Sequence, residues 1–164
     1  MKKLSVIIAS TSALFLGSNA YALNVYAPYV EKGIMEIESK NRFDFDDRSS
    51  ENNFRQHKFG IGYGLTSNWG LEIVGELEKE NGHGYKYTAT EIENIFQFTE
   101  VGQYWADVGL QASYEFKHPD GDADKVEAFL LIAKNFSKIT TMANIGFEQE
   151  VGSNSNSNPE GEIK

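Results

Sequence analysis

The chain has 164 residues, a length typical of one domain, and it contains no cysteine. Disulfides, thiolate chemistry and cysteine-ligated metals are therefore excluded. Its 24 acidic residues outnumber its 15 Lys and Arg, so the formal net charge is −9. A surface that binds phosphates needs the opposite sign, and we therefore expect no nucleic-acid partner.

The N-terminus has the three parts of a secretory signal peptide. Lysines form a basic start, residues 4–17 form an apolar run that contains Ser and Thr, and Ala20 and Ala22 give an A-x-A cleavage site. The apolar run is too short to span a membrane as a helix. We therefore predict a signal peptide over residues 1–22, cleaved after Ala22, with an uncleaved N-terminal anchor as the alternative.

Alternation of apolar and polar residues with a period of two dominates the rest of the chain. The clearest case spans residues 104–116. One face carries Tyr104, Ala106, Val108, Leu110, Ala112, Tyr114 and Phe116, and the other carries Trp105, Asp107, Gly109, Gln111, Ser113 and Glu115. Strands place successive side chains on opposite faces, so this pattern predicts a strand with one apolar and one polar face.

The same alternation recurs and predicts an all-β fold, an antiparallel up-and-down meander of about seven long strands. The predicted strands are residues 33–46, 58–65, 69–78, 91–98, 104–116, 125–136 and 139–150. Short and long polar connections alternate, so short turns gather at one end of the sheet and long loops at the other. Residues 23–151 form the predicted meander, and residues 152–164 a polar outside loop and chain end.

Three features favour a transmembrane β-barrel over a soluble sheet. The predicted strands are longer than the roughly 5–6 residues usual in soluble sheets. The apolar residues are too bulky for the interior of a small soluble barrel. Aromatic residues gather near both ends of the apolar face, as in the girdles of membrane barrels. These candidate interface aromatics are Tyr63, Trp69, Phe98, Tyr104, Tyr114, Phe116, Phe136 and Phe147.

The pattern thus predicts a protein of the outer membrane of a Gram-negative bacterium, in contact with outer-membrane lipid, acting as a passive channel or an envelope structural element. The alternative is a soluble periplasmic β-sandwich that acts as a binding module, because apolar faces packed inward give the same alternation. Bacterial single-chain barrels have an even number of strands. About seven strands therefore predict an incomplete barrel, closed by missing C-terminal strands or by partner chains in an oligomer.

Three stretches carry a resemblance to known proteins. Residues 25–33, VYAPYVEKG, residues 93–100, ENIFQFTE, and residues 104–110, YWADVGL, resemble a group of uncharacterised exported proteobacterial proteins. That group is generally interpreted as outer-membrane β-barrels. The resemblance covers most of the chain after the signal peptide, and it implies a fold without a chemistry or a catalytic residue. Members of the group are longer, so the resemblance also implies a truncated member.

Acidic residues crowd the polar face. If that face lines a lumen, the candidates for an acidic wall are Glu36, Glu38, Glu72, Glu76, Glu91, Glu93, Asp107 and Glu148. Rings of acidic residues favour cations, so the predicted partners are inorganic cations or small solutes. A solvated polar face with interstrand ion pairs is the alternative interpretation, since missing strands could supply balancing Lys and Arg.

No motif indicates an enzyme. His57, His83 and His118 are the only histidines, and the Asp-rich residues 120–124 lack the closing Glu of an EF-hand because Leu131 takes its place. No Ser lies in a G-x-S-x-G motif, and no glycine-rich phosphate loop follows a predicted strand. We therefore expect no catalytic residue, no cofactor and no metal site.

Overall fold

The computed structural model describes residues 6–16, 25–45, 54–118, 122–152, 154–155 and 159–163. Within these residues the chain is all-β, and no helix has the length and apolar character needed to span a bilayer. The strands are β1 (Val6–Leu16), β2 (Met35–Phe45), β3 (Phe54–Gly64), β4 (Trp69–Lys79), β5 (Lys86–Gln97), β6 (Asp107–Lys117), β7 (Asp124–Phe136), β8 (Ile139–Val151) and β9 (Glu160–Ile163). The predicted cleavage residues, Ala20 and Ala22, lie outside the described residues.

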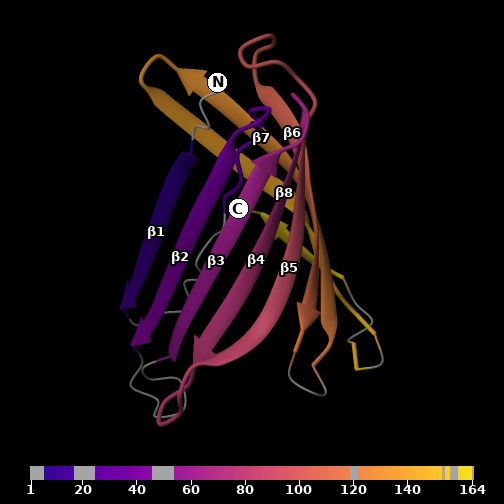
Figure 1. Ribbon diagram of the computed structural model, residues 1–164. Coiled ribbons are helices and arrows are strands. Elements are labelled where there is room, and N and C mark those ends of the chain that lie inside the picture. The colour runs from indigo at the N-terminus through magenta and orange to yellow at the C-terminus, as the bar shows by residue number, and fades with distance from the viewer. Residues whose placement is uncertain are drawn as a thin grey trace.

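All the strands belong to one sheet, in which they follow the order of the sequence. The eight strands β2–β9 pair antiparallel with their neighbours, which confirms the predicted up-and-down meander. Figure 1 shows that the sheet curls, with β1–β5 on the near side and β7 and β8 behind them. The sheet is open, with β1 and β9 at its edges, and its described strands do not form a sandwich of two sheets.

The strand count differs from the prediction at both ends of the sheet. β9 lies within a stretch predicted to be a polar loop, and it pairs with residues 145–148 of β8. β1 lies within the predicted signal peptide and pairs with β2 in parallel. Its apolar, β-branched start, Val6-Ile7-Ile8, suits a strand as well as a signal sequence. The signal peptide stays a prediction, and its cleavage would remove β1.

The structure corrects the start of the clearest predicted strand. β6 begins at Asp107 rather than at Tyr104, because the preceding residues form a turn. Trp105 is 77% exposed and Ala106 is 4% exposed, the reverse of the predicted facing. The amide of Gly102 donates to Asp107 Oδ1 at 2.7 Å instead of to a neighbouring strand. Regular alternation therefore begins only at Asp107.

The two faces of the sheet differ in chemistry. We call the face that carries Glu72, Glu93 and Gln111 the inner face, and the opposite face, which carries Ile61 and Ile73, the outer face. Glu93 is 2% exposed and Gln111 is fully buried, whereas Ile73 is 55% exposed. Because successive side chains of a strand alternate, β3–β8 are together mostly polar on the buried face and apolar on the exposed face.

A small apolar core also lies on the inner face. Phe129 and Leu131 of β7 are fully buried and pack with Tyr26, and Ile95 borders this cluster. Residues 128–133 of β7 are continuously apolar, so this strand carries large apolar side chains on both faces. The segment that precedes β2 covers the apolar part of the inner face.

Candidate functional site: an acidic row beneath an N-terminal strap

A row of glutamates crosses the inner face at one level. Residues that lie directly opposite one another on neighbouring strands define this acidic row, from Glu36 through Gly62, Glu72, Glu93, Ser113, Glu127 and Glu148 to Glu160. Side chains directly opposed across an antiparallel pair have Cβ atoms about 4.5–5.5 Å apart, so Glu72 neighbours Glu93, and Glu148 neighbours both Glu127 and Glu160. No Lys or Arg occupies a position in it.

Lysines lie one and two rows away from the acidic row, toward the long loops. Lys58 Nζ lies 2.9 Å from Glu76 Oε2, and 3.6 Å from both Glu91 Oε2 and Glu115 Oε2. The three carboxylates are nearly buried, so Lys58 offsets charges that water reaches poorly. Lys40 lies directly opposite Lys58 on β2. Basic charge is therefore concentrated beside the acidic row and not within it.

Other lysines form single ion pairs on the same face. Lys40 Nζ lies 2.6 Å from Glu38, and Lys125 Nζ lies 2.7 Å from Glu148 at one end of the acidic row. Lys40 and Glu38 lie on the same strand, whereas Lys125 with Glu148 and Lys58 with Glu76 are interstrand ion pairs, as the alternative interpretation expects. They coexist with the acidic row rather than replacing it.

The centre of the acidic row contains buried oxygens without a hydrogen-bond partner among the described residues. They are Glu72 Oε1, Glu93 Oε2 and Ser113 Oγ, and the amide of Gln111, one row away, is likewise unbonded. Leaving a buried polar atom unpaired costs about 1–3 kcal/mol. Several such atoms in one place make this part of the inner face the candidate functional site, because packing alone would select apolar or paired residues there.

Residues 25–32 form an extended segment that crosses the inner face, and we call it the strap. Tyr26 and Pro28 are buried, whereas Ala27 and Tyr29 are half-buried, as expected of an extended chain with one side on a surface. The strap follows a single transverse row of the wall. That row consists of Gln97, Gly109, Leu131 and Asn144, which lie directly opposite one another on β5–β8.

Two amide side chains bind the strap backbone. Asn144 Oδ1 accepts a hydrogen bond from Tyr26 N at 2.7 Å, and Asn144 Nδ2 donates to Tyr26 O at 3.0 Å. Gln97 Oε1 accepts from Val30 N at 2.8 Å. These amides satisfy backbone groups that a neighbouring strand would otherwise have to pair.

Glycines provide the space in which the strap lies. A Cβ on Gly109 would lie 2.9 Å from Pro28 Cβ, and a Cβ on Gly64 would collide with the carbonyl oxygen of Glu31. Gly33 has a φ of +80°, a left-handed conformation that favours glycine, and its amide donates to Gly64 O at 2.8 Å. The chain therefore turns at Gly33 from the strap into β2.

The strap directs two phenols at acidic side chains. Burial and the Glu93 carboxylate raise the pKa of Tyr26 well above its usual range, so its hydroxyl stays protonated and donates to Glu93 Oε1 at 3.4 Å. Burial also raises the pKa of Tyr29, whose hydroxyl donates to Asp107 Oδ2 at 3.0 Å. The strap therefore reaches the acidic row from the short-turn side.

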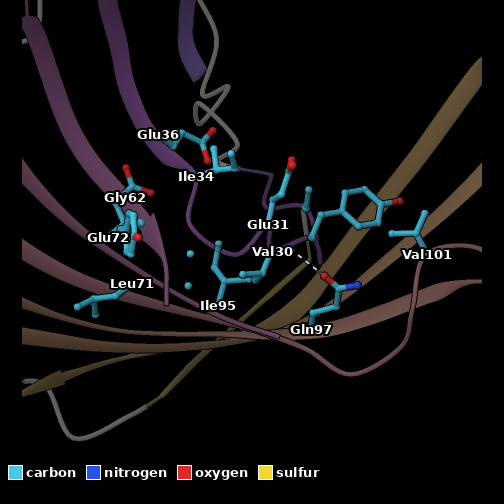
Figure 2. Close-up of a pocket in the computed structure, with 15 residues that line it drawn as sticks. Val30, Glu31, Ile34, Glu36, Gly62, Leu71, Glu72, Ile95, Gln97 and Val101 are labelled. Carbon is cyan, nitrogen blue, oxygen red and sulfur yellow. Dashed lines mark hydrogen bonds between the residues drawn. The ribbon is translucent and has the colours of Figure 1, made fainter. Parts of the chain in front are cut away.

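A cavity of about 470 Å³ lies between the strap and the inner face of the sheet. Figure 2 shows Glu36 and Glu72 on one side of this cavity, and Val30 bonded to Gln97 on the other. Its lining includes three carboxylates, those of Glu31, Glu36 and Glu72, and no Lys or Arg. The space that the strap leaves open is therefore acidic.

All the predicted wall acids lie on the inner face, because along each strand they are an even number of positions away from the acidic row. Glu36, Glu72, Glu93 and Glu148 belong to that row, Glu38 and Glu91 lie one row away, Glu76 lies two rows away, and Asp107 lies at the short-turn end. Asp107 differs from the others in role, since it holds the strap through Tyr29 and the turn through Gly102.

The predicted interface aromatics lie on the outer face or in the turns beside it. The exposed ones are Tyr63, Trp69, Phe98, Tyr104, Phe116, Phe136 and Phe147. Tyr114 is half-buried, and its hydroxyl donates to Asp124 Oδ2 at 2.8 Å. Trp69 stacks on Phe96 with ring centres 6.2 Å apart, which gives the short-turn end a broad aromatic surface.

The histidines bond to neighbouring polar groups. His57 Nε2 lies 2.9 Å from the hydroxyl of Tyr85, and His118 Nε2 lies 2.7 Å from Thr90 Oγ1. No group of three or more His, Cys, Asp or Glu side chains in the described part of the chain could hold a metal ion. Asp120 of the Asp-rich stretch lies outside the described residues.

The strap and its amide partners were not predicted from the sequence. A usable signal exists, since Gln97 and Asn144 are amides at inner-face positions, and Gly109 lies in the same row. No family model, curated protein or solved structure matches the chain. The resemblance to exported proteobacterial proteins therefore stays a prediction.

Proposed function

We propose that this chain is a transmembrane β-barrel protein of the outer membrane of a Gram-negative bacterium, exported by the signal peptide of residues 1–22. The observation that carries the proposal is the reversed polarity of the sheet. The outer face exposes Phe59, Ile61 and Ile73, while the inner face buries Glu93, Gln111 and Asn144. In water this arrangement would expose a large apolar surface. In a bilayer the apolar outer face would contact lipid, and the polar inner face would line the interior of the barrel.

The aromatic residues support the same proposal. Trp69 and Phe136 lie beside short turns, Phe98 begins the longer connection between β5 and β6 at the same end of the sheet, and Phe116 and Phe147 lie toward the opposite end. Aromatic side chains in outer-membrane barrels form such girdles at the two interfaces, where an apolar ring meets polar headgroups. The apolar outer residues, Ile61 and Ile73 among them, would then lie in the hydrocarbon layer between the girdles.

We further propose that the protein has no enzymatic role and is an envelope structural element whose interior serves as a passive, cation-preferring path when it is open. The acidic row supports a preference for cations, because carboxylates lower the barrier to cation entry. The unpartnered oxygens of Glu72, Glu93 and Ser113 provide groups that could replace part of the hydration shell of an ion. Small inorganic cations fit this site better than anions.

A closed barrel requires that the edges of the open sheet be paired. Unpaired backbone groups in lipid cost several kcal/mol each, so an open edge does not persist there. We propose that further strands, from this polypeptide or from other copies in an oligomer, close the wall. The size of the chemically cross-linked species in isolated outer membranes distinguishes the two sources.

Fractionation of cells that express the full chain tests the proposal. We expect the protein in the outer membrane, with an electrophoretic mobility that changes on heating because the folded barrel resists detergent at low temperature. A freely soluble periplasmic product with no heat-dependent mobility would contradict the barrel. That result would favour the alternative, a soluble periplasmic binding module.

A further inference from the structure

The direction of the strap is the starting point. Each strand connects the short-turn end of the sheet with the long-loop end. The strap instead crosses β5–β8 along one row and does not run beside a strand. It binds β8 through Asn144, packs on β6 at Gly109, binds β5 through Gln97 and passes over Gly64 of β3. An element that crosses the strands at one level obstructs the interior at that level.

The contacts of the strap suit a segment that can be displaced. Its backbone is held to the wall by the three bonds from Asn144 and Gln97. Each such hydrogen bond contributes only modestly to stability, and the glycines beneath the strap add no interlocking side chains. Gly33, with its φ of +80°, joins the strap to β2 and can serve as the pivot.

The strap also reaches the acidic row through the side chain of Tyr26. The Tyr26 hydroxyl donates to Glu93 Oε1, and the Tyr26 ring packs on Phe129 and Leu131. Glu93 is almost fully buried while the strap is in place. Movement of the strap would uncover this carboxylate and connect the 470 Å³ cavity beside Glu36 and Glu72 with the short-turn end.

We propose that the strap is a plug. In its bound position it closes the interior at the short-turn end. When it moves away from the row of Gln97, Gly109, Leu131 and Asn144, it opens a cation path past the acidic row. This inference rests on the proposed function, because it requires a barrel in a bilayer. It adds a defined closed state and a defined moving part. The docked strap and an open pore exclude each other.

Single-channel recording on the full chain in planar bilayers tests the plug. We compare the wild type with the double variant Gln97→Ala and Asn144→Ala, which removes all three amide bonds to the strap. We expect the open-to-closed ratio to rise roughly a hundredfold. Asn68→Ala, in an exposed turn, is the matched loss of an amide and should leave the ratio unchanged.

A reversible cross-link provides the second test. A Cβ on Gly70 would lie 3.6 Å from Val30 Cγ1, so Val30→Cys with Gly70→Cys can join the strap to β4, and the chain has no other cysteine. In the Gln97→Ala and Asn144→Ala background, oxidation should close the pore and reduction should reopen it.

The outcomes separate the plug from the barrel. Variants that insert and show heat-dependent mobility, yet conduct no more than the wild type, overturn the plug and leave the barrel standing. Open currents that persist after complete oxidation of the cysteine pair also overturn it. Failure of the wild type itself to insert removes the proposed function, and the plug with it.

Discussion

The side chain of Asn144 on β8 pairs with both backbone groups of Tyr26, 118 residues earlier in the chain. It accepts from the amide at 2.7 Å and donates to the carbonyl at 3.0 Å, with both residues buried. A single planar amide thus replaces the partner strand that Tyr26 would need as part of a sheet. The strap can therefore lie across the strands without leaving this peptide unpaired.

Loss of the Asn144 amide should destabilise the folded protein. In Asn144→Ala, the N–H and the carbonyl of Tyr26 lose their partners in a buried place, so we expect the free energy of unfolding to fall by about 2–4 kcal/mol. Urea unfolding of the lipid-inserted chain measures this change in the free energy of unfolding. Asn68→Ala removes the same group from an exposed turn and should change the value by less than about 0.5 kcal/mol. Equal effects of the two variants would mean that the strap is not bound through Asn144.

Adjacent positions on β4 test which face meets lipid. Ile73 is exposed on the outer face, whereas Glu72 lines the cavity on the inner face. Arginine at a lipid-facing position near mid-membrane costs about 2–4 kcal/mol. We therefore expect Ile73→Arg to reduce folding into lipid vesicles by that amount, and Glu72→Arg to have a much smaller effect. If Glu72→Arg proves the more harmful variant, the assignment of the two faces is wrong.

We expect the stability of the folded protein to depend strongly on Lys58. Lys58→Met leaves Glu76, Glu91 and Glu115 close together without their shared cation, and removing one partner of a buried ion pair costs about 3–5 kcal/mol. The yield of heat-modifiable protein and its urea midpoint should both drop sharply. Lys138→Met, in the exposed turn between β7 and β8, is the control and should behave as the wild type. A stable Lys58→Met protein would show that water or other cations neutralise these acids.

The facing of the strands could be predicted from the sequence because each strand repeats a local rule. Glu72 and Ile73 alternate in the sequence as they do in space, and this holds wherever the ladder is regular. The rule fails at Trp105 and Ala106, since Asp107 caps a turn that precedes β6. Local alternation carries no information about where a ladder starts.

The acidic row and the strap could not be predicted, because both depend on contacts between distant residues. The row exists only when Glu72 lies opposite Glu93 and Glu127 lies opposite Glu148, and turn lengths and a register shift in β4 set that alignment. Five of the eight strap residues, 25–32, are apolar, but their order along the chain does not say which strands they pack against. Burial of the strap depends on Asn144, far along the chain.

Ion selectivity tests the acidic row itself. Glu72 and Glu93 lie directly opposite each other on β4 and β5, and each has a carboxylate oxygen without a partner among the described residues. Glu76 lies on the same face but is bonded to Lys58 at 2.9 Å. An acid in direct contact with a lysine attracts a passing cation less than an acid that forms no direct ion pair among the described residues.

Glu72→Gln with Glu93→Gln should therefore weaken the preference for cations, and Glu76→Gln should change it less. One carboxylate at about 8 Å in water attracts a cation, and repels an anion, by about 0.5 kcal/mol, so loss of two should lower the cation-to-anion permeability ratio roughly thirtyfold. The measurement is the reversal potential under a salt gradient, in the Gln97→Ala and Asn144→Ala background, where the strap leaves the path open. High salt should reduce the difference, because mobile ions screen the wall. Anion preference with both glutamates intact would contradict the proposed role of the row, since no arrangement of these carboxylates attracts anions.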